Sequence, residues 1–158
     1  MAMAIRDDEA LESLPMRLIV VAVAAAMSII PAAEALETLQ DRDFVSRARL
    51  TMDNLVGVAQ MLSMQGPGAA RTVDVDLSSE GGLRALGLRV GDVPGGAYAN
   101  VVAIELSSGA SLLRLAQEPP VAMASAEGGT LVVEAEQFTL RMEAALLGDE
   151  RVVTVEVV

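Results

Sequence analysis

The stretch Leu18-Ile-Val-Val-Ala-Val-Ala-Ala-Ala-Met-Ser-Ile-Ile-Pro-Ala-Ala33 contains no charged residue, and it limits what the rest of the chain can be. As a helix it rises about 24 Å, which is less than the roughly 30 Å of a bilayer core. Extended from Leu14 to Leu36, the helix reaches about 34 Å. Arg17 and Glu34 then lie near the two interfaces, where long charged side chains can snorkel. We therefore expect a helix that can span a membrane.

Alanine dominates this helix and favours close packing between helices. Ala22 with Ala26, and Ala24 with Ser28, are pairs of small residues four positions apart that let two backbones approach. We expect the helix to be inserted in a membrane first and then to pack against copies of itself. The residues expected to carry this assembly are Glu12, Leu18, Ile19, Ala22, Ala26, Ile30 and Pro31. A simple single-span anchor is the alternative, and a cleaved secretory signal fits less well because the preceding segment is acidic.

Pro31 interrupts the apolar run. Inside a helix it removes the hydrogen bond to the carbonyl of Met27, and its ring presses on that turn. The sequence predicts either a kink or local melting over Ser28–Pro31, or the end of the membrane helix there.

A second, amphipathic part of the helix follows over residues 34–64. Its apolar residues recur at spacings of three and four, which is typical of a helix with one buried face. We expect this stripe to dock on the domain that follows, with a coiled-coil seam as the alternative. The stripe consists of Ala48, Met52, Leu55, Ala59 and Leu62.

Gly66-Pro67-Gly68 predicts the end of the helix, because glycine offers a left-handed cap and proline cannot continue the helical hydrogen bonds.

Beyond residue 68 the apolar period falls to two. Seven short alternating runs separated by glycine- and proline-containing turns predict an antiparallel β-sandwich, Ig-like, or a barrel. The alternation shifts by one position between Ala135 and Phe138, which predicts a turn or bulge near Glu136 and Gln137. The fold class is therefore α+β. The expected segments are an acidic N-terminal segment (1–13), a long helix (14–65) and a β-domain (69–158).

The composition excludes several classes of function. Of the 158 residues none is cysteine, histidine, tryptophan or lysine, and the net charge is −11. Thiol, imidazole and Cys/His zinc chemistry are thus absent, and nucleic-acid binding is disfavoured because it needs a basic face and stacking rings. Asp74 and Asp76 share one strand face and with Glu80 could approach a hard cation, but a solvated polar face explains them better. We expect no enzyme activity, no cofactor and no metal site.

Two segments carry a resemblance to a known family. Arg6-Asp-Asp-Glu-Ala-Leu-Glu-Ser-Leu-Pro-Met-Arg17 leads directly into the apolar run, and Gln65-Gly-Pro-Gly-Ala-Ala-Arg-Thr-Val-Asp-Val-Asp-Leu77 joins the helix to the first strand. Together with the order of one apolar helix, an amphipathic extension and a cysteine-free β-domain, they resemble the type IV pilin-like proteins of archaea.

The resemblance implies a subunit of a helical cell-surface filament used in adhesion. In that family a prepilin peptidase trims the membrane-inserted precursor, the assembly machinery polymerises it, and the helices form the filament core with the β-domains outside. Glu12 resembles the glutamate that pairs with a neighbouring N-terminus. The usual basic residue and glycine before the cut are not present near 6–9, so an uncut pilin-like membrane protein or a minor filament component is an alternative. A single-pass envelope protein whose β-domain is a binding module is another.

Overall fold

A computed structural model describes the backbone of residues 8–158 and the side chains of residues 16–27, 29 and 31–158. One helix, α1 (Asp8–Gln65), precedes eight strands. The chain divides into two compact units, residues 1–39 and residues 40–158. The second unit, which we call the head, therefore contains the last part of α1 together with all the strands.

Helix α1 continues through Pro31, so the expected local melting or helix end at this position is wrong. A proline removes one backbone hydrogen bond and crowds one turn. The flanking residues are mostly alanine and isoleucine, and the helix continues on both sides. It ends at Gln65, as the sequence predicts: Gly66 and Gly68 have φ of 91° and 90°, and the Gly66 amide donates to the Leu62 carbonyl at 3.1 Å.

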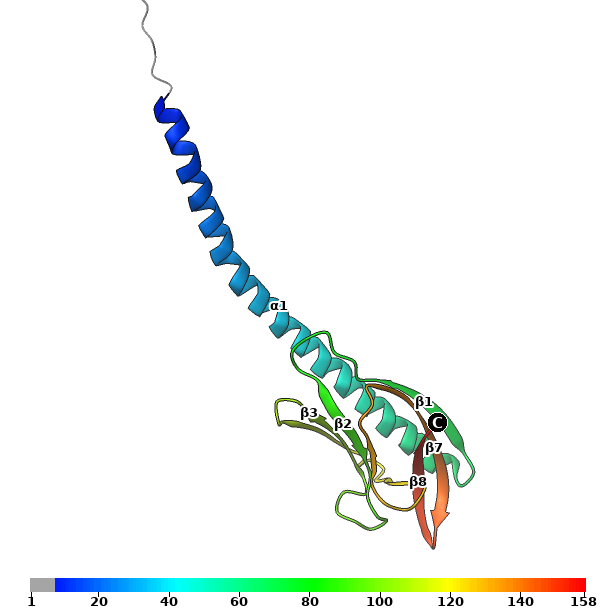
Figure 1. Cartoon of the computed structure of the whole chain (residues 1–158). Helices are drawn as coiled ribbons and strands as arrows, with labels where there is room; N and C mark the ends of the chain where they lie inside the picture. The colour runs from blue at the N-terminus through cyan, green and yellow to red at the C-terminus, as the bar shows by residue number, and fades with distance from the viewer. Residues whose placement is uncertain (1–7) are drawn as a thin grey trace, which may run out of the picture. The chain divides into compact units, whose positions relative to one another are not determined.

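The strands of the head form two four-stranded sheets. One sheet has the order β1-β7-β8-β5 and the other β4-β3-β2-β6, and all neighbours are antiparallel except β5 and β8. Figure 1 shows β1, β7 and β8 grouped in one sheet, and β2 beside β3 in the other. The strands are β1 (Ala70–Asp76), β2 (Ala85–Val90), β3 (Val101–Leu106), β4 (Ser111–Leu115), β5 (Ala122–Ser125), β6 (Leu131–Val133), β7 (Gln137–Leu147) and β8 (Glu150–Val157).

Each of the seven alternating runs in the sequence falls on a strand, and the α+β class is confirmed. The phase shift near Glu136 marks the place where the chain leaves β6 in one sheet and enters β7 in the other. Strand β5 was not predicted. Its sequence, Ala-Met-Ala-Ser, is short and made of residues with little preference for strands, and it pairs with β8 in parallel.

Both sheets and the last part of α1 share one hydrophobic core. Alternate strand residues enter it, for example Leu88 and Val90 from β2 and Leu140 and Met142 from β7, each with 1% or less of its surface exposed. Phe44 on α1 is the only fully buried aromatic residue of the head, Phe138 is partly buried against the core, and Tyr98 is exposed. Among the described residues no polar or charged side chain is buried.

Candidate assembly helix and the hollow beside β4

The described part of α1 in residues 16–39 exposes every side chain whose position is known. Leu18 is 67% exposed and Val23, the least exposed of the large apolar residues there, is 52% exposed. Its most apolar 18-residue window has a mean hydropathy of 2.1, and none of that window is buried. By length and composition this is a helix that could cross a membrane, and a signal sequence or a core helix would pass the same test.

Most residues expected to carry assembly lie on this exposed segment. Leu18, Ile19, Ala22, Ala26 and Pro31 are all exposed. The side chains of Glu12 and Ile30 lie outside the described residues. An exposed apolar surface of this kind is the condition that assembly or membrane insertion requires.

The five residues of the amphipathic stripe are all buried in the head. Ala48, Met52, Leu55, Ala59 and Leu62 are 1% exposed or less and belong to the shared core. Sequence reasoning missed Phe44, which is 1% exposed and lies four residues before Ala48, so the same spacing rule would have found it.

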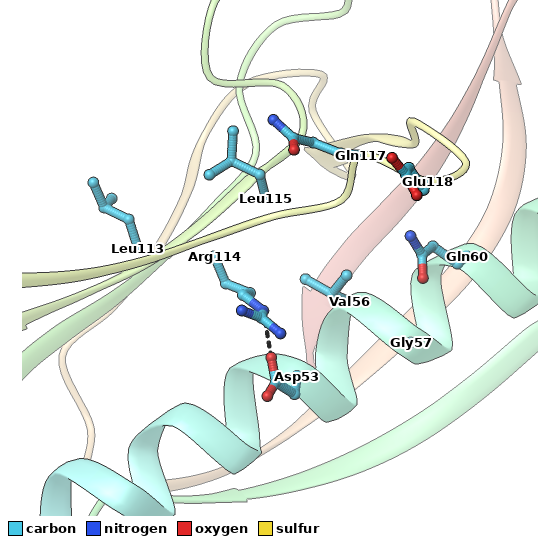
Figure 2. Close-up of a pocket in the computed structure, with 9 residues that line it drawn as sticks. All are labelled: Asp53, Val56, Gly57, Gln60, Leu113, Arg114, Leu115, Gln117 and Glu118. Carbon is cyan, nitrogen blue, oxygen red and sulfur yellow. Dashed lines mark ion pairs between the residues drawn. The ribbon is translucent and has the colours of Figure 1, made fainter.

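A hollow of about 590 Å³ lies between α1 and strand β4. Figure 2 shows Asp53 paired with Arg114 across it, with Gly57 on the helix and Leu113 and Leu115 on the strand. Gly57 leaves its side of the hollow open, because a Cβ added there would meet nothing within 4 Å. Nothing in the sequence suggested this hollow, because its two walls are about 60 residues apart along the chain.

The chemistry of the hollow is mixed. Its lining includes the buried side chain of Val56, the Asp53–Arg114 ion pair and the amide of Gln60, which donates to the Pro119 carbonyl at 3.3 Å. Nowhere in the described chain do three or more Asp, Glu, His or Cys residues gather closely enough to hold a metal ion. The hollow is a concave surface beside the edge strand β4. Its lining residues include no nucleophile paired with a base.

The two strand carboxylates considered for a cation already have partners. Asp74 accepts from the Thr139 hydroxyl at 2.8 Å, and Asp76 accepts from the Ser78 amide at 2.9 Å and the Ser78 hydroxyl at 2.6 Å. The Ser78 bonds, together with the Gln137 amide, hold the pKa of Asp76 below its ordinary value. Their arrangement closes the end of β1 and ties it to β7.

Comparison of the chain with protein-family models, with curated proteins and with solved structures found no match. The functional argument therefore depends on the geometry above and on the sequence.

Proposed function

We propose that the protein is a non-catalytic structural subunit of a type IV pilus-like cell-surface filament of archaeal type. It assembles through the helix of residues 14–64 and carries the head on the outside. The observation that carries the proposal is the apolar run whose every described side chain is exposed. Exposed apolar surface of this extent marks a contact with lipid or with another protein.

Two features of the run favour copies of itself over permanent residence in lipid. Only seven of its residues between positions 18 and 33 are of the kind that contributes about −0.3 to −0.6 kcal/mol each to insertion. The alanines contribute little to insertion, but their small side chains let helices approach closely. A precursor held in the membrane can therefore leave it for a bundle at modest cost.

Charge at the start of the helix supports the same arrangement. A carboxylate such as Glu12 is costly to bury unless a cation meets it. Arg6, Arg17 or the α-amino group of a neighbouring chain would supply that cation in a bundle. The proposed partners are further copies of the chain, the membrane before assembly, the assembly machinery and a prepilin peptidase.

We further propose that the head is an Ig-like sandwich in which α1 fills part of the space between the sheets. The support is that both sheets and the stripe of α1 contribute to one core. In the filament this head would face the surroundings and make the adhesive contacts.

The competing function is a membrane anchor that carries a binding module, and a double substitution separates the two. Ala22→Leu with Ala26→Leu makes the helix more apolar, which favours insertion, but it blocks close approach of backbones. We expect membrane insertion to persist and filaments, seen by electron microscopy, to disappear.

A matched control places the changes on the far side of the helix. Val20→Leu with Met27→Leu keeps the segment apolar and leaves the small pair intact, and this variant should form filaments like the wild type. Equal assembly by both variants, or a strictly monomeric wild-type protein, would contradict the proposal and favour the anchor.

A further inference from the structure

The four sheet edges of the head differ in how well they are protected. An open edge offers unpaired backbone groups to another strand, and proteins usually block it with charge or cover it. Edge strand β1 carries Arg71, Asp74 and Asp76. Edge strand β5 is covered, because the Met123 amide donates to the Ala99 carbonyl at 2.6 Å and its carbonyl accepts from the Asp92 amide at 3.1 Å. The remaining edges, β4 and β6, belong to the same sheet.

Backbone groups on β4 and β6 point away from that sheet. The Ala116 amide donates to the Asn100 carbonyl, and the Leu106 amide donates to the Ala110 carbonyl. Because backbone groups alternate in direction along a strand, the even-numbered residues of β4 direct their amides and carbonyls toward β3. Leu113 therefore directs its amide and carbonyl to the free edge. By the same alternation, Val132 does so on β6. No hydrogen bond from another segment of residues 8–158 covers either of them.

Leu113 and Val132 are also the two ends of one row of side chains. The register pairs Leu113 with Ala103, Ala103 with Arg89, and Arg89 with Val132 across the outer face of the sheet. Both end residues are apolar and exposed, at 61% and 54%. A row that begins and ends in an exposed apolar residue can continue into the same row of another copy.

Strand direction makes this continuation compatible with a filament whose subunits all point the same way. The four strands β4, β3, β2 and β6 alternate in direction, so β4 and β6 run in opposite directions. Two copies in the same orientation would then pair β6 with β4 as antiparallel strands. Pairing β4 with β4 about a two-fold axis would instead reverse one head relative to the other.

We propose that, in the filament, β4 of each subunit pairs with β6 of the next, with Leu113 opposite Val132. The inference rests on the proposed function, since it assigns the contact between heads of the same filament. In this register Leu115 lies opposite Thr130 and Ser111 opposite Glu134, so no like charges face each other. For a protein with a net charge of −11, a contact in which no acidic residue lies opposite another keeps repulsion between copies low.

The space beside β4 is open. The hollow of about 590 Å³ runs beside Leu113 and Leu115, and Gly57 on the helix side has no side chain to fill it. Arg114, the one charged residue of β4, is held by Asp53 on α1 and so is drawn away from the edge (Figure 2).

The absence of cysteine from the chain allows a direct test by disulfide cross-linking of the full-length protein. Opposed residues on antiparallel strands lie about 4.5–5.5 Å apart at Cα, within the range that a disulfide spans.

Filaments of the double variant Leu113→Cys/Val132→Cys are oxidised and analysed on a denaturing, non-reducing gel. We expect a ladder of covalent multimers, and only monomer from each single variant. Thr72→Cys/Ser125→Cys, on the two edges of the other sheet, is the matched control and should give no ladder.

Each result has a distinct meaning. Filaments that give no ladder with the Leu113/Val132 pair would overturn this contact and leave the proposed function standing. Dimers from Leu113→Cys alone would show β4 paired with β4 and would also overturn it. If the wild-type chain forms no filaments, both the proposed function and the contact are wrong.

Discussion

Gly91 follows strand β2 of one sheet and lies against the backbone of Met123 on strand β5 of the other sheet. Its φ is +65°, its amide donates to Val101, and a Cβ added there would lie 1.9 Å from the Met123 carbonyl oxygen. Gly91→Ala should therefore reduce the free energy of unfolding by about 2–4 kcal/mol, since it combines backbone strain with a steric clash. Urea unfolding of the full chain in detergent, followed by circular dichroism, measures this.

The control for that substitution is another glycine with the opposite expectation. Gly57 sits inside a helix with open space around its missing Cβ. Gly57→Ala should increase the free energy of unfolding by about 0.5–1 kcal/mol, because glycine is a poor helix former. An equal effect of the two substitutions would contradict the placement of Gly91.

Asp76 gives the head a pH-dependent contribution to stability. The Ser78 hydrogen bonds and the Gln137 amide lower its pKa from the ordinary 3.8, so the ionised form is favoured in the folded state. This contribution is complete above the unfolded pKa and is lost as the pH falls through the folded pKa. We expect wild type to be more stable than Asp76→Asn at pH 7 and the difference to shrink below pH of about 4.

Removal of the donor tests the cause of that difference. In a Ser78→Ala background the side-chain donor is gone, and the effect of Asp76→Asn should become smaller. A difference that is independent of pH, or unchanged by Ser78→Ala, would show that the side chain acts by packing instead.

At the scale of elements, the two faces of α1 within the head should differ sharply in their tolerance of substitution. Met52 is 1% exposed and Leu50, two residues away, is 66% exposed. Met52→Ala should lower the free energy of unfolding by about 2–5 kcal/mol because it leaves a cavity in the core. Leu50→Ala should change it by less than about 0.5 kcal/mol. Similar losses for both would mean that α1 does not pack on the sheets through this stripe.

The periodicity of the sequence predicted the elements whose residues alternate between core and solvent. The stripe from Ala48 to Leu62 and the runs on β1, β2, β3, β7 and β8 are of this kind, because burial itself imposes the pattern. The run on β4 is an exception, since Leu113 and Leu115 are exposed on the outer face of the sheet. Strand β5 was not predicted because it is four residues long and half of it is alanine. The sequence predicts an interruption at Pro31, yet α1 continues through it, since one missing hydrogen bond does not end a helix that is favourable on both sides.

Of the candidate surfaces, the sequence predicts only the one whose residues are consecutive in the chain. The exposed apolar segment is visible in composition alone. The hollow beside β4 and the row from Leu113 to Val132 depend on sheet order, which a single sequence does not encode in any local pattern. The strand order places Leu113 and Val132 at opposite edges of one sheet, and only the register shows that they share a row.

On the scale of the whole molecule, the division at residue 40 predicts that the head can be separated from the apolar segment. Residues 40–158 contain every described buried hydrophobic residue. A chain that begins at Gln40 should therefore fold and stay in solution, while the full chain sediments with membranes or filaments. Sedimentation and circular dichroism test this, and an unfolded head would contradict the assignment of the core.

The central claim is that residues 14–36 act as an assembly surface and not only as an anchor. Electron microscopy of the full chain beside a variant in which residues 14–36 are exchanged for an unrelated, leucine-rich spanning helix tests it most directly. The account predicts filaments from the wild type and, from the exchange variant, a folded head held in the membrane without filaments. Filaments from both proteins, or from neither, would contradict it.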